Sequence, residues 1–300
     1  MKGLPGYLLY RLLAAIFGLL PPRAVRYAGR GIGLSVSYVA SGRMALLRRH
    51  MRRVLGDEAS EEEITSAARE MFASYGRYWA EVFWFRPRRR QWAISHTEID
   101  GREAVVAAHR EGRGLVLAIA HLGNWEVASP VAASLGFPII SVAEELSNRR
   151  ITDWFIETRA GFGSEILVAG RGPTMSSLAR AVKEGKAAAL VADRDVMGRG
   201  VEVEFFGERT SMPSGPAALA ELTGAALFPV GTYFEGDRYR LVVYPELELD
   251  ESVENRPERI QIATQHLAEA FEDIVRRAPS QWHLFQPNWP SDRAWLEKQT

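Results

Sequence analysis

The sequence predicts an α/β fold in which a mostly parallel central sheet is flanked by helices and preceded by a helical N-terminal elaboration. From Ile94 onward, apolar runs of strand length alternate with helical patterns, which is typical of parallel sheets with crossover helices. Residues 1–95 carry helical patterns instead, and no low-complexity linker separates the two regions. With 300 residues and 47% hydrophobic content, the chain can bury a substantial core. We expect a single domain, 1–300, with a helical part, 1–95, and an α/β core, 96–300.

The first element is an apolar run from Tyr7 to Leu20, in which Arg11 is the only charge. It spans fourteen residues, whereas a membrane-spanning helix needs roughly 20. Pro21-Pro22-Arg23 follows in place of a small-residue cleavage site, which argues against a removed signal peptide. The run therefore fits a helix lying in a membrane interface, with an ordinary buried N-terminal helix as the alternative.

Charge is distributed unevenly along the chain. The chain has 37 basic and 37 acidic side chains, yet residues 1–56 contain ten Lys or Arg and no acid. The ten are Lys2, Arg11, Arg23, Arg26, Arg30, Arg43, Arg48, Arg49, Arg52 and Arg53. Such asymmetry indicates an anionic partner, either nucleic acid or a membrane leaflet. Because the basic residues are interleaved with apolar ones, we expect a membrane-docking elaboration on an anionic surface, through residues 1–56, and no nucleic acid.

The strongest helix start in the N-terminal part is Ser60 followed by three acids, 61–63, because acids favour the positive end of the helix dipole. This helix should run to about Phe85, with its aromatic stripe packed in the core. The segment 86–90 combines Pro87 with four arginines and should end the helix. It could contact phospholipid headgroups or form a solvated turn.

Seven apolar runs in the second part predict strands. They are 115–120, 138–143, 166–169, 187–192, 201–206, 225–230 and 239–244. Helices are expected between them, around 127–135, 147–161, 174–184 and 214–223, and a last, charge-rich helix over 257–277.

The main candidate site lies where the strand 115–120 ends. His121 follows this strand directly, and Glu126 comes five residues later at the start of the next predicted helix. Ligands of α/β sheets bind at such strand-to-helix turns. A histidine there can take a proton from a hydroxyl, and a carboxylate can orient the ring. We predict that His121 lies in the loop and Glu126 in the first helical turn, so that the two can meet. A purely structural histidine is the alternative.

Several catalytic signatures are absent from the sequence. It has no G-x-S-x-G elbow, P-loop, H-E-x-x-H or G-x-G-x-x-G motif, and the six histidines lack metal-ligand spacing. There is no cysteine, which excludes disulfides, thiol nucleophiles and thiolate metal sites. Asp193 and Asp195 form a D-x-D pattern after the strand 187–192, which in many glycosyltransferases binds a metal with a nucleotide sugar.

The segment His121-Leu-Gly-Asn-Trp-Glu126 resembles the H-x4-D/E motif of the glycerolipid and lipid A acyltransferases. Further segments make the chain similar to the actinobacterial phosphatidylinositol mannoside acyltransferases. They are Val142-Ala143-Glu144, Arg159-Ala-Gly-Phe162, Ala192-Asp193-Arg194-Asp195, Val203-Glu204-Phe205-Phe206-Gly207-Glu208, Met212-Pro213-Ser214-Gly215-Pro216, Gly224-Ala-Ala-Leu-Phe-Pro229 and Trp282-His-Leu-Phe-Gln-Pro-Asn-Trp289. The match covers about 110–295. Family members often have Asp where this chain has Glu126, and Glu where it has Asp193.

The resemblance implies that His121 is a general base with Glu126 as its partner. The base would take the proton of an acceptor hydroxyl that attacks the thioester of acyl-CoA or acyl carrier protein, with no covalent acyl-enzyme. A backbone N–H near Gly123 could stabilise the oxyanion. Other side chains are expected to bind the substrates. They are Asn124, Glu144, Arg159, Asp193, Arg194 and His283. Two of these have alternatives: Arg159 could pair with Glu126, and His283 could be a histidine of the core that only packs behind the site.

We therefore expect a membrane-associated acyltransferase that moves a fatty acyl chain from acyl-CoA to a mannose hydroxyl of a phosphatidylinositol mannoside, without metal or cofactor. It would lie peripherally on the cytoplasmic face of the plasma membrane. The alternatives are an acyltransferase for another glycolipid, a lipid A-like precursor or a lysophospholipid; a metal-dependent glycosyltransferase using Asp193 and Asp195; and a lipid-binding protein with a decayed site.

Overall fold

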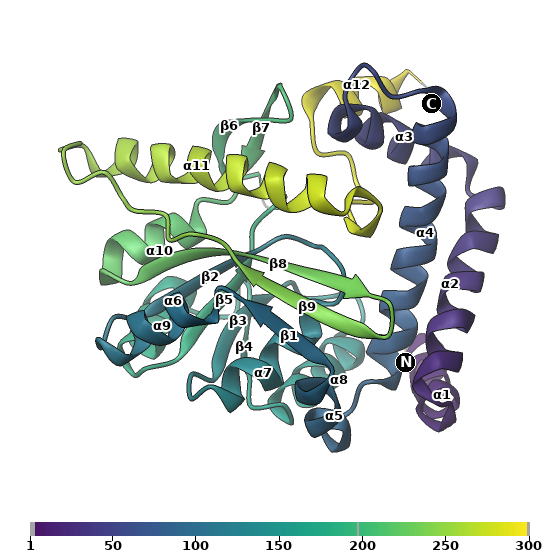
Figure 1. Ribbon diagram of the computed structural model, residues 1–300, viewed down its shortest axis with the longest axis horizontal. Helices are drawn as coiled ribbons and strands as arrows, with labels where there is room; N and C mark the ends of the chain where they lie inside the picture. The colour runs from purple at the N-terminus through teal and green to yellow at the C-terminus, as the bar shows by residue number, and fades with distance from the viewer. Residues whose placement is uncertain (1–3, 197, 299–300) are drawn as a thin grey trace.

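The computed structural model describes residues 4–196 and 198–298, and its centre is a seven-stranded sheet (Figure 1). The strand order is β1-β9-β8-β2-β5-β3-β4, and all neighbours are parallel except β8 and β9. The strands are β1 (Thr97–Asp100), β2 (Leu115–Ile119), β3 (Ile139–Ala143), β4 (Glu165–Val168), β5 (Ala187–Val191), β8 (Ala226–Glu235) and β9 (Arg238–Val243). The predicted α/β class with a mostly parallel sheet is confirmed.

Helices cover both faces of this sheet because its central strands are apolar on both sides. Along β2, Leu115, Leu117 and Ile119 pack against α6 (Arg102–Arg110) and α7 (Ala128–Ser134). Val116 and Ala118 point to the opposite face, which is covered by three helices. These are α9 (Thr174–Lys183), α10 (Gly215–Thr223) and α11 (Arg256–Arg277). The period of two in the strand thus separates two cores.

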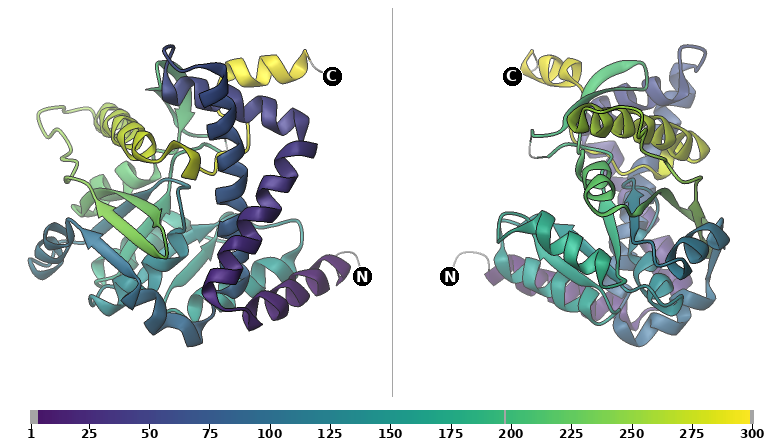
Figure 2. Two further views of the ribbon diagram at one scale, coloured as in Figure 1. Left: turned by 45° about the vertical axis from the view of Figure 1, so that its right-hand side comes forward. Right: turned by 90° about the vertical axis from the view of Figure 1, so that its left-hand side faces the viewer.

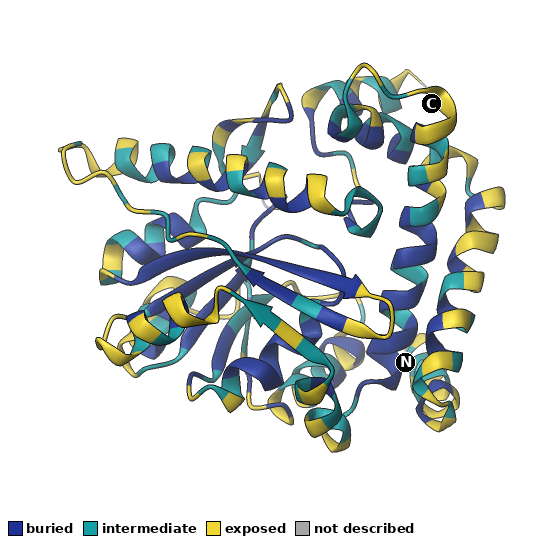
Figure 3. Ribbon diagram, viewed as in Figure 1, coloured by how far each residue is buried: buried dark blue, intermediate teal, exposed yellow. Residues whose placement is uncertain are grey.

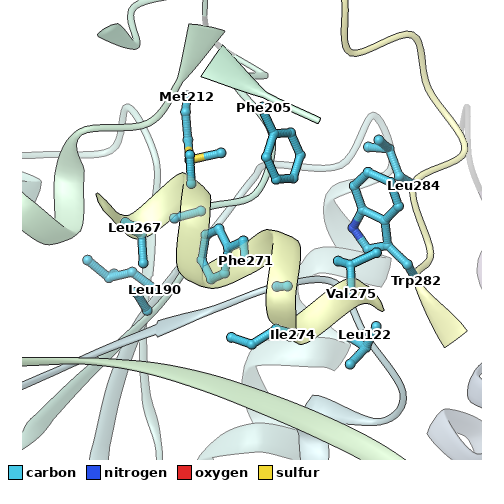
Figure 4. Packing of buried hydrophobic residues seen from close by; sticks show 14 of the residues in the cluster. Leu122, Leu190, Phe205, Met212, Leu267, Phe271, Ile274, Val275, Trp282 and Leu284 are labelled. Atoms are coloured by element: carbon cyan, nitrogen blue, oxygen red, sulfur yellow. The ribbon is translucent and has the colours of Figure 1, made fainter. Parts of the chain in front are cut away.

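The apolar run 201–206 forms a strand, but this strand is not part of the central sheet. β6 (Val201–Phe205) pairs with β7 (Glu208–Met212) in a separate antiparallel hairpin. Phe205 and Met212 of the hairpin pack in the same cluster as Phe271 of α11 and Leu190 of β5 (Figure 4). The hairpin therefore extends the core on the far side of α11.

Four helices form the N-terminal part, beside one end of the sheet (Figures 1 and 2). They are α1 (Leu4–Leu19), α2 (Pro22–Val39), α3 (Ser41–Leu55) and α4 (Glu61–Trp84). The predicted start of α4 is a capping box, in which Ser60 and Glu63 satisfy each other's backbone N–H groups. Short helices follow at η1 (Pro87–Arg89) and α5 (Arg90–Ser95), and α8 (Arg149–Ala160), η3 (Pro279–Gln281) and α12 (Pro290–Glu297) complete the structure.

Glycines allow α2 to lie directly on α4. A Cβ on Gly29 would come 2.6 Å from both Ala80 Cβ and the carbonyl oxygen of Gly76, and one on Gly33 would overlap the carbonyl of Phe72. Small residues four apart let two helix backbones approach closely. Because α4 packs in the core, its close contact with α2 also fixes the position of α2 relative to the core.

The basic residues of segment 1–56 are mostly paired within the protein, which the sequence did not indicate. Arg26 bonds the carboxylates of Glu81 and Asp237, and Arg49 and Arg53 bond Asp292. Further pairs are Arg23–Asp237, Arg30–Glu70, Arg48–Glu61, Arg52–Glu61 and Arg53–Glu208. The acids come from later in the chain, so local sequence made the segment look more cationic than its surface is. Lys2 lies outside the described residues.

Apolar exposure, in contrast, is concentrated on the first two helices. Eleven of the fifteen large apolar side chains exposed among the described residues lie there. They are Leu8, Leu9, Leu12, Ile16, Leu19, Tyr27, Ile32, Leu34, Val36, Tyr38 and Val39. Figure 3 shows exposed residues along α2, which covers α4 from outside. Within the described part of the chain, no helix combines the length and apolar content needed to cross a bilayer.

Candidate active site

His121 and Asp193 meet at the carboxyl edge of the sheet, just beyond the ends of the adjacent strands β2 and β5. Nδ1 of His121 lies 2.6 Å from Oδ1 of Asp193, and the backbone N–H of His121 donates to Oδ2 over 3.0 Å. Trp282 donates its indole N–H to the same Oδ2 over 2.8 Å. Three hydrogen bonds thus fix one buried carboxylate against the imidazole.

The charge of Asp193 determines which nitrogen of the His121 ring carries the proton. Burial alone would raise the pKa of Asp193, but the His121 ring and the hydrogen bonds from His121 and Trp282 outweigh it and hold that pKa below its usual value. The group is therefore a carboxylate, which only accepts hydrogen bonds. Nδ1 must then carry the ring proton of a neutral His121, and Nε2 is left as its basic nitrogen.

Glu126 does not hold the His121 ring, and in this respect the prediction is wrong. Glu126 does lie in the short helical turn after the loop, η2 (Trp125–Val127). Its carboxylate, however, is bound by Arg159 through Nε at 3.0 Å and Nη2 at 2.5 Å, and Tyr78 donates to it over 3.4 Å. Because Nδ1 of His121 is bound to Asp193 and the Glu126 carboxylate is bound to Arg159, the nearest acid in sequence is not the partner of the imidazole.

Hydrogen bonds on the side away from the cleft hold the turn between His121 and Glu126. Asn124 is buried; its side-chain oxygen accepts from the Glu126 N–H, and its amide donates to Glu81 over 2.7 Å. Asn124 therefore shapes the turn and does not line the cleft, contrary to its expected role in substrate binding. Gly123, at φ 57°, donates its N–H to the carbonyl of Gln281 over 3.0 Å. The oxyanion role suggested for a backbone N–H near Gly123 therefore finds no free donor in Gly123 itself.

A cleft of about 310 Å³ opens beside His121, over the carboxyl ends of β2, β3 and β5. Its apolar wall combines small and branched aliphatic residues of the strands with aromatic side chains of α4, η2 and α8, among them Trp79, Trp125 and Phe155. Its lining includes one histidine and four charged side chains: His121, Glu126, Glu144, Arg159 and Arg194. A mostly apolar space with polar groups at one side suits an alkyl chain with a polar end.

Of the charges expected to bind substrate, Glu144, Arg159 and Arg194 line this cleft. Arg194 lies 3.4 Å from Glu144 across it. Asp193 is instead fully buried behind His121 and does not line the cleft, which corrects its expected role in substrate binding.

The two acids of the D-x-D pattern face different partners. Asp195 accepts from the Gly200 N–H over 2.7 Å and the Ser211 hydroxyl over 2.6 Å, whereas Asp193 is committed to His121 and Trp282. Among the described residues, no group of three His, Asp or Glu is placed to share a metal ion.

His283 is a second histidine close to His121, and of the two roles considered for it the structure shows the core histidine and not the substrate-binding one. It is buried among Tyr75, Tyr78 and Trp125, and its Nε2 lies 2.9 Å from the Ser74 hydroxyl. Burial and the nearby His121 lower the pKa of His283 to about 3. It is therefore a neutral core residue that does not line the cleft, and its backbone N–H donates to the carbonyl of His121 over 2.7 Å.

Three contributors were missed as members of the site. Tyr78 supports Glu126, Glu81 supports Asn124, and Trp282 supports Asp193. Only Trp282 had a signal in the sequence, in the segment 282–289, and an isolated antiparallel bridge between Leu122 and Trp282 brings that segment beside the turn. Tyr78 and Glu81 were hidden in the aromatic face of α4.

The chain is similar in sequence to several known acyltransferases. The model of the bacterial lipid A biosynthesis acyltransferases matches residues 4–291. The chain is 36% identical over 269 residues to a phosphatidylinositol mannoside acyltransferase of Mycolicibacterium smegmatis, covering 87% of this chain and 84% of that protein. It is also 36% identical over 258 residues to one of Mycobacterium tuberculosis, covering 82% and 77%. A lipid A biosynthesis acyltransferase of Haemophilus influenzae is 22% identical over 229 residues, covering 74% and 68%.

Proposed function

The chain belongs to the bacterial lipid A biosynthesis acyltransferase family, and we propose that it moves a fatty acyl chain from acyl-CoA to a mannose hydroxyl of a phosphatidylinositol mannoside. The observation that carries this proposal is the His121–Asp193 pair at the edge of an apolar cleft. The names of the 36% identical relatives support the acceptor.

In the proposed reaction, Nε2 of His121 takes the proton of the acceptor hydroxyl while its oxygen bonds to the thioester carbonyl carbon. The tetrahedral intermediate then expels the thiolate, which takes the proton from the imidazolium, so that ester and free thiol are released. Asp193 keeps Nδ1 protonated and stabilises the imidazolium in between. General-base help of this kind contributes about 10²–10⁴-fold.

The same cleft offers a place for each substrate. Its aromatic and small apolar walls suit the acyl chain, and Glu144 and Arg194 at its polar side suit sugar hydroxyls or a phosphate. Arg159 is already bound to Glu126, so we assign this pair to the cleft wall. The reaction as written needs no metal or cofactor besides the donor.

We further propose that α1 and α2 dock the enzyme peripherally on the cytoplasmic face of the plasma membrane, an anionic surface. The apolar side chains exposed on these helices support docking by insertion into the lipid interface. Tyr10 of α1 packs edge-on against Trp79 and Phe155, which also line the cleft. A lipid held at α1 would thus lie close to the cleft. Because most arginines of segment 1–56 are paired, we assign electrostatic attraction a smaller part than their number suggested.

The test offers purified protein palmitoyl-CoA or palmitoyl-acyl carrier protein together with one of three acceptors: a phosphatidylinositol mannoside, a lysophospholipid or a lipid A precursor. Mass spectrometry of the products should show one added acyl group on a mannose of the first acceptor. His121→Ala should abolish it, and EDTA should leave it unchanged. Acylation of only the other acceptors would replace the proposed substrate, and full turnover by His121→Ala would refute the mechanism.

A further inference from the structure

A second pocket, of about 350 Å³, lies behind the catalytic turn and shares no lining residue with the cleft. It is bounded by α2, α4, the turn between β8 and β9, and η3. Figure 1 shows the tip of the β8–β9 hairpin beside α4, where this pocket is formed. Its volume is roughly ten times the ~30 Å³ that one water occupies in the liquid, so it has room for a polyatomic ion.

Arginines dominate the lining of this pocket. Four guanidinium groups, those of Arg23, Arg26, Arg30 and Arg77, face two carboxylates, those of Glu70 and Asp237. Asp237 is shared between Arg23 at 2.9 Å and Arg26 at 2.7 Å, and Glu70 lies 2.5 Å from Arg30. Even with Glu81, which lies behind the lining and pairs with Arg26 and Arg77, positive charge is in excess.

The decisive group is Arg77. Its side chain is only 7% exposed, with Nε donating to Glu81 over 2.9 Å and the guanidinium stacked 3.9 Å above the Phe234 ring. Its Nη2 is buried and has no hydrogen-bond partner among the described residues. A charged donor buried without an acceptor is costly, and native proteins satisfy such groups. Because Arg77 lines the pocket, an anionic acceptor there would complete its hydrogen bonding.

We infer that this pocket binds a phosphate group. Planar guanidinium forks match the oxygens of a tetrahedral phosphate, and several of them around one space are typical of phosphate recognition. The group can come from a phospholipid headgroup or from free phosphate. Tyr27 forms part of the rim and is largely exposed on α2, the helix whose apolar residues face outward, so a lipid phosphate could reach the pocket.

Residues that surround the pocket also hold the turn that carries His121. Glu81, which holds Arg26 and Arg77, also accepts from Asn124 over 2.7 Å, and Gln281 of the lining accepts from the N–H of Gly123. A phosphate in this pocket is therefore one residue away from the turn that carries His121. Binding of phosphate in this pocket does not depend on the proposed acyl transfer.

Isothermal titration calorimetry with inorganic phosphate, at constant ionic strength set by chloride, tests the site directly. Wild type and His121→Ala should both bind one phosphate saturably. Arg77→Lys keeps the charge but loses the fork, and should weaken binding at least tenfold. Arg30→Gln, at the rim, should weaken phosphate binding severalfold. This variant tests the same pocket if Arg77→Lys unfolds at a lower temperature than wild type. Arg180→Gln, which changes an exposed arginine of α9, is the matched control and should bind as wild type does.

A second arm repeats the titration with phosphatidylglycerol vesicles present, and with phosphatidylcholine vesicles as the zwitterionic comparison. Displacement of phosphate by the anionic vesicles, lost in the pocket variants, identifies a lipid headgroup as the ligand. Unchanged phosphate binding identifies free phosphate. Absence of saturable binding of phosphate and of any pocket-dependent vesicle binding would overturn the inference, as would equal affinity in wild type, Arg77→Lys and Arg30→Gln.

Discussion

His121 and Asp193 are 72 positions apart in the chain, yet Nδ1 of one lies 2.6 Å from Oδ1 of the other. The contact follows from the sheet, because β2 and β5 are neighbours and Ile119 is in register with Val191. Two residues beyond each register position, the chain places the imidazole and the carboxylate side by side. The pair is thus positioned by the backbone pairing of the two strands that lead to it.

The Arg159–Glu126 pair should stabilise the cleft wall. Arg159→Met leaves the Glu126 carboxylate, whose side chain is 9% exposed, without its bidentate partner. We expect the free energy of unfolding in urea to fall by about 3 kcal/mol, the usual cost of stranding a buried charge. Glu126→Gln combined with Arg159→Met removes both charges and should recover part of the loss. A double variant that loses the sum of the two single effects would contradict this account.

The glycine contact between α2 and α4 should be intolerant of a side chain. Gly33→Ala places a methyl group against the carbonyl of Phe72, and a retreat of α2 from this clash would also open its close contact with α4 at Gly29. We expect a loss of about 1–3 kcal/mol in the free energy of unfolding, the usual effect of overpacking.

Gly31→Ala is the matched control, because a Cβ at Gly31 meets nothing within 4 Å. It should leave the protein equally stable or stabilise it by up to about 1 kcal/mol, since alanine is the better helix former. Equal losses for both variants would mean that α2 is not packed on α4 as described.

Buried His283 should make stability depend on pH. Its pKa is lowered to about 3 in the folded protein, against about 6.5 in an unfolded chain. The unfolded state therefore binds one proton more between these values, and stability present above pH 6.5 is lost as pH falls toward 3. The contribution to the slope approaches about 1.4 kcal/mol per pH unit near pH 4.5.

The measurement is urea unfolding between pH 4.5 and 6.5 for wild type and His283→Phe, whose ring suits the aromatic surroundings of this position. The slope of the unfolding free energy against pH should be smaller in the variant, by an amount that corresponds to about one bound proton. If both slopes coincide, His283 does not stay neutral in the folded protein.

Docking through α1 should depend on apolar side chains more than on charge. Leu12→Asp with Leu19→Asp places two carboxylates on its exposed face, and should weaken binding to anionic liposomes at least tenfold, since burial of one leucine is worth roughly 1.5–3 kcal/mol. Raising the salt concentration to 0.5 M should reduce liposome binding of wild type by less than the double substitution does. Met175→Asp with Leu222→Asp, on α9 and α10, is the control for added charge. Flotation that responds to salt alone would contradict insertion of α1.

Most of the core elements were predictable because their strands and helices have clean periodicity. The exceptions have physical reasons. β1 is an edge strand with Ile99 as its one large apolar residue, and β7 is a polar strand paired only with β6. The pairing of β6 was also beyond sequence reasoning, since an apolar run looks alike in a sheet and in a hairpin that packs under a helix.

The site shows the same limit more sharply. Each charged residue at a strand end was identifiable, but their pairing depends on strand order. β3 and β4 separate β2 from β5 in the chain, whereas β2 and β5 are adjacent in the sheet. Local spacing therefore favoured Glu126 as the partner of His121. The pairing of Glu126 with Arg159 of α8, 33 residues away, was one of the alternatives for that arginine, and the structure confirms it.

The most direct test of the central claim is the turnover number for acyl transfer by Asp193→Asn compared with Glu126→Gln. In Asp193→Asn the new side-chain amide could still accept from the indole of Trp282 but could not stabilise an imidazolium, so this variant should lose about 10²–10⁴-fold. In Glu126→Gln the amide oxygen could still bond Arg159, so that variant should stay within about tenfold of wild type. Thermal unfolding of both variants checks that each is folded. A folded Asp193→Asn enzyme that turns over as fast as wild type would contradict the assignment of Asp193 as the partner of His121.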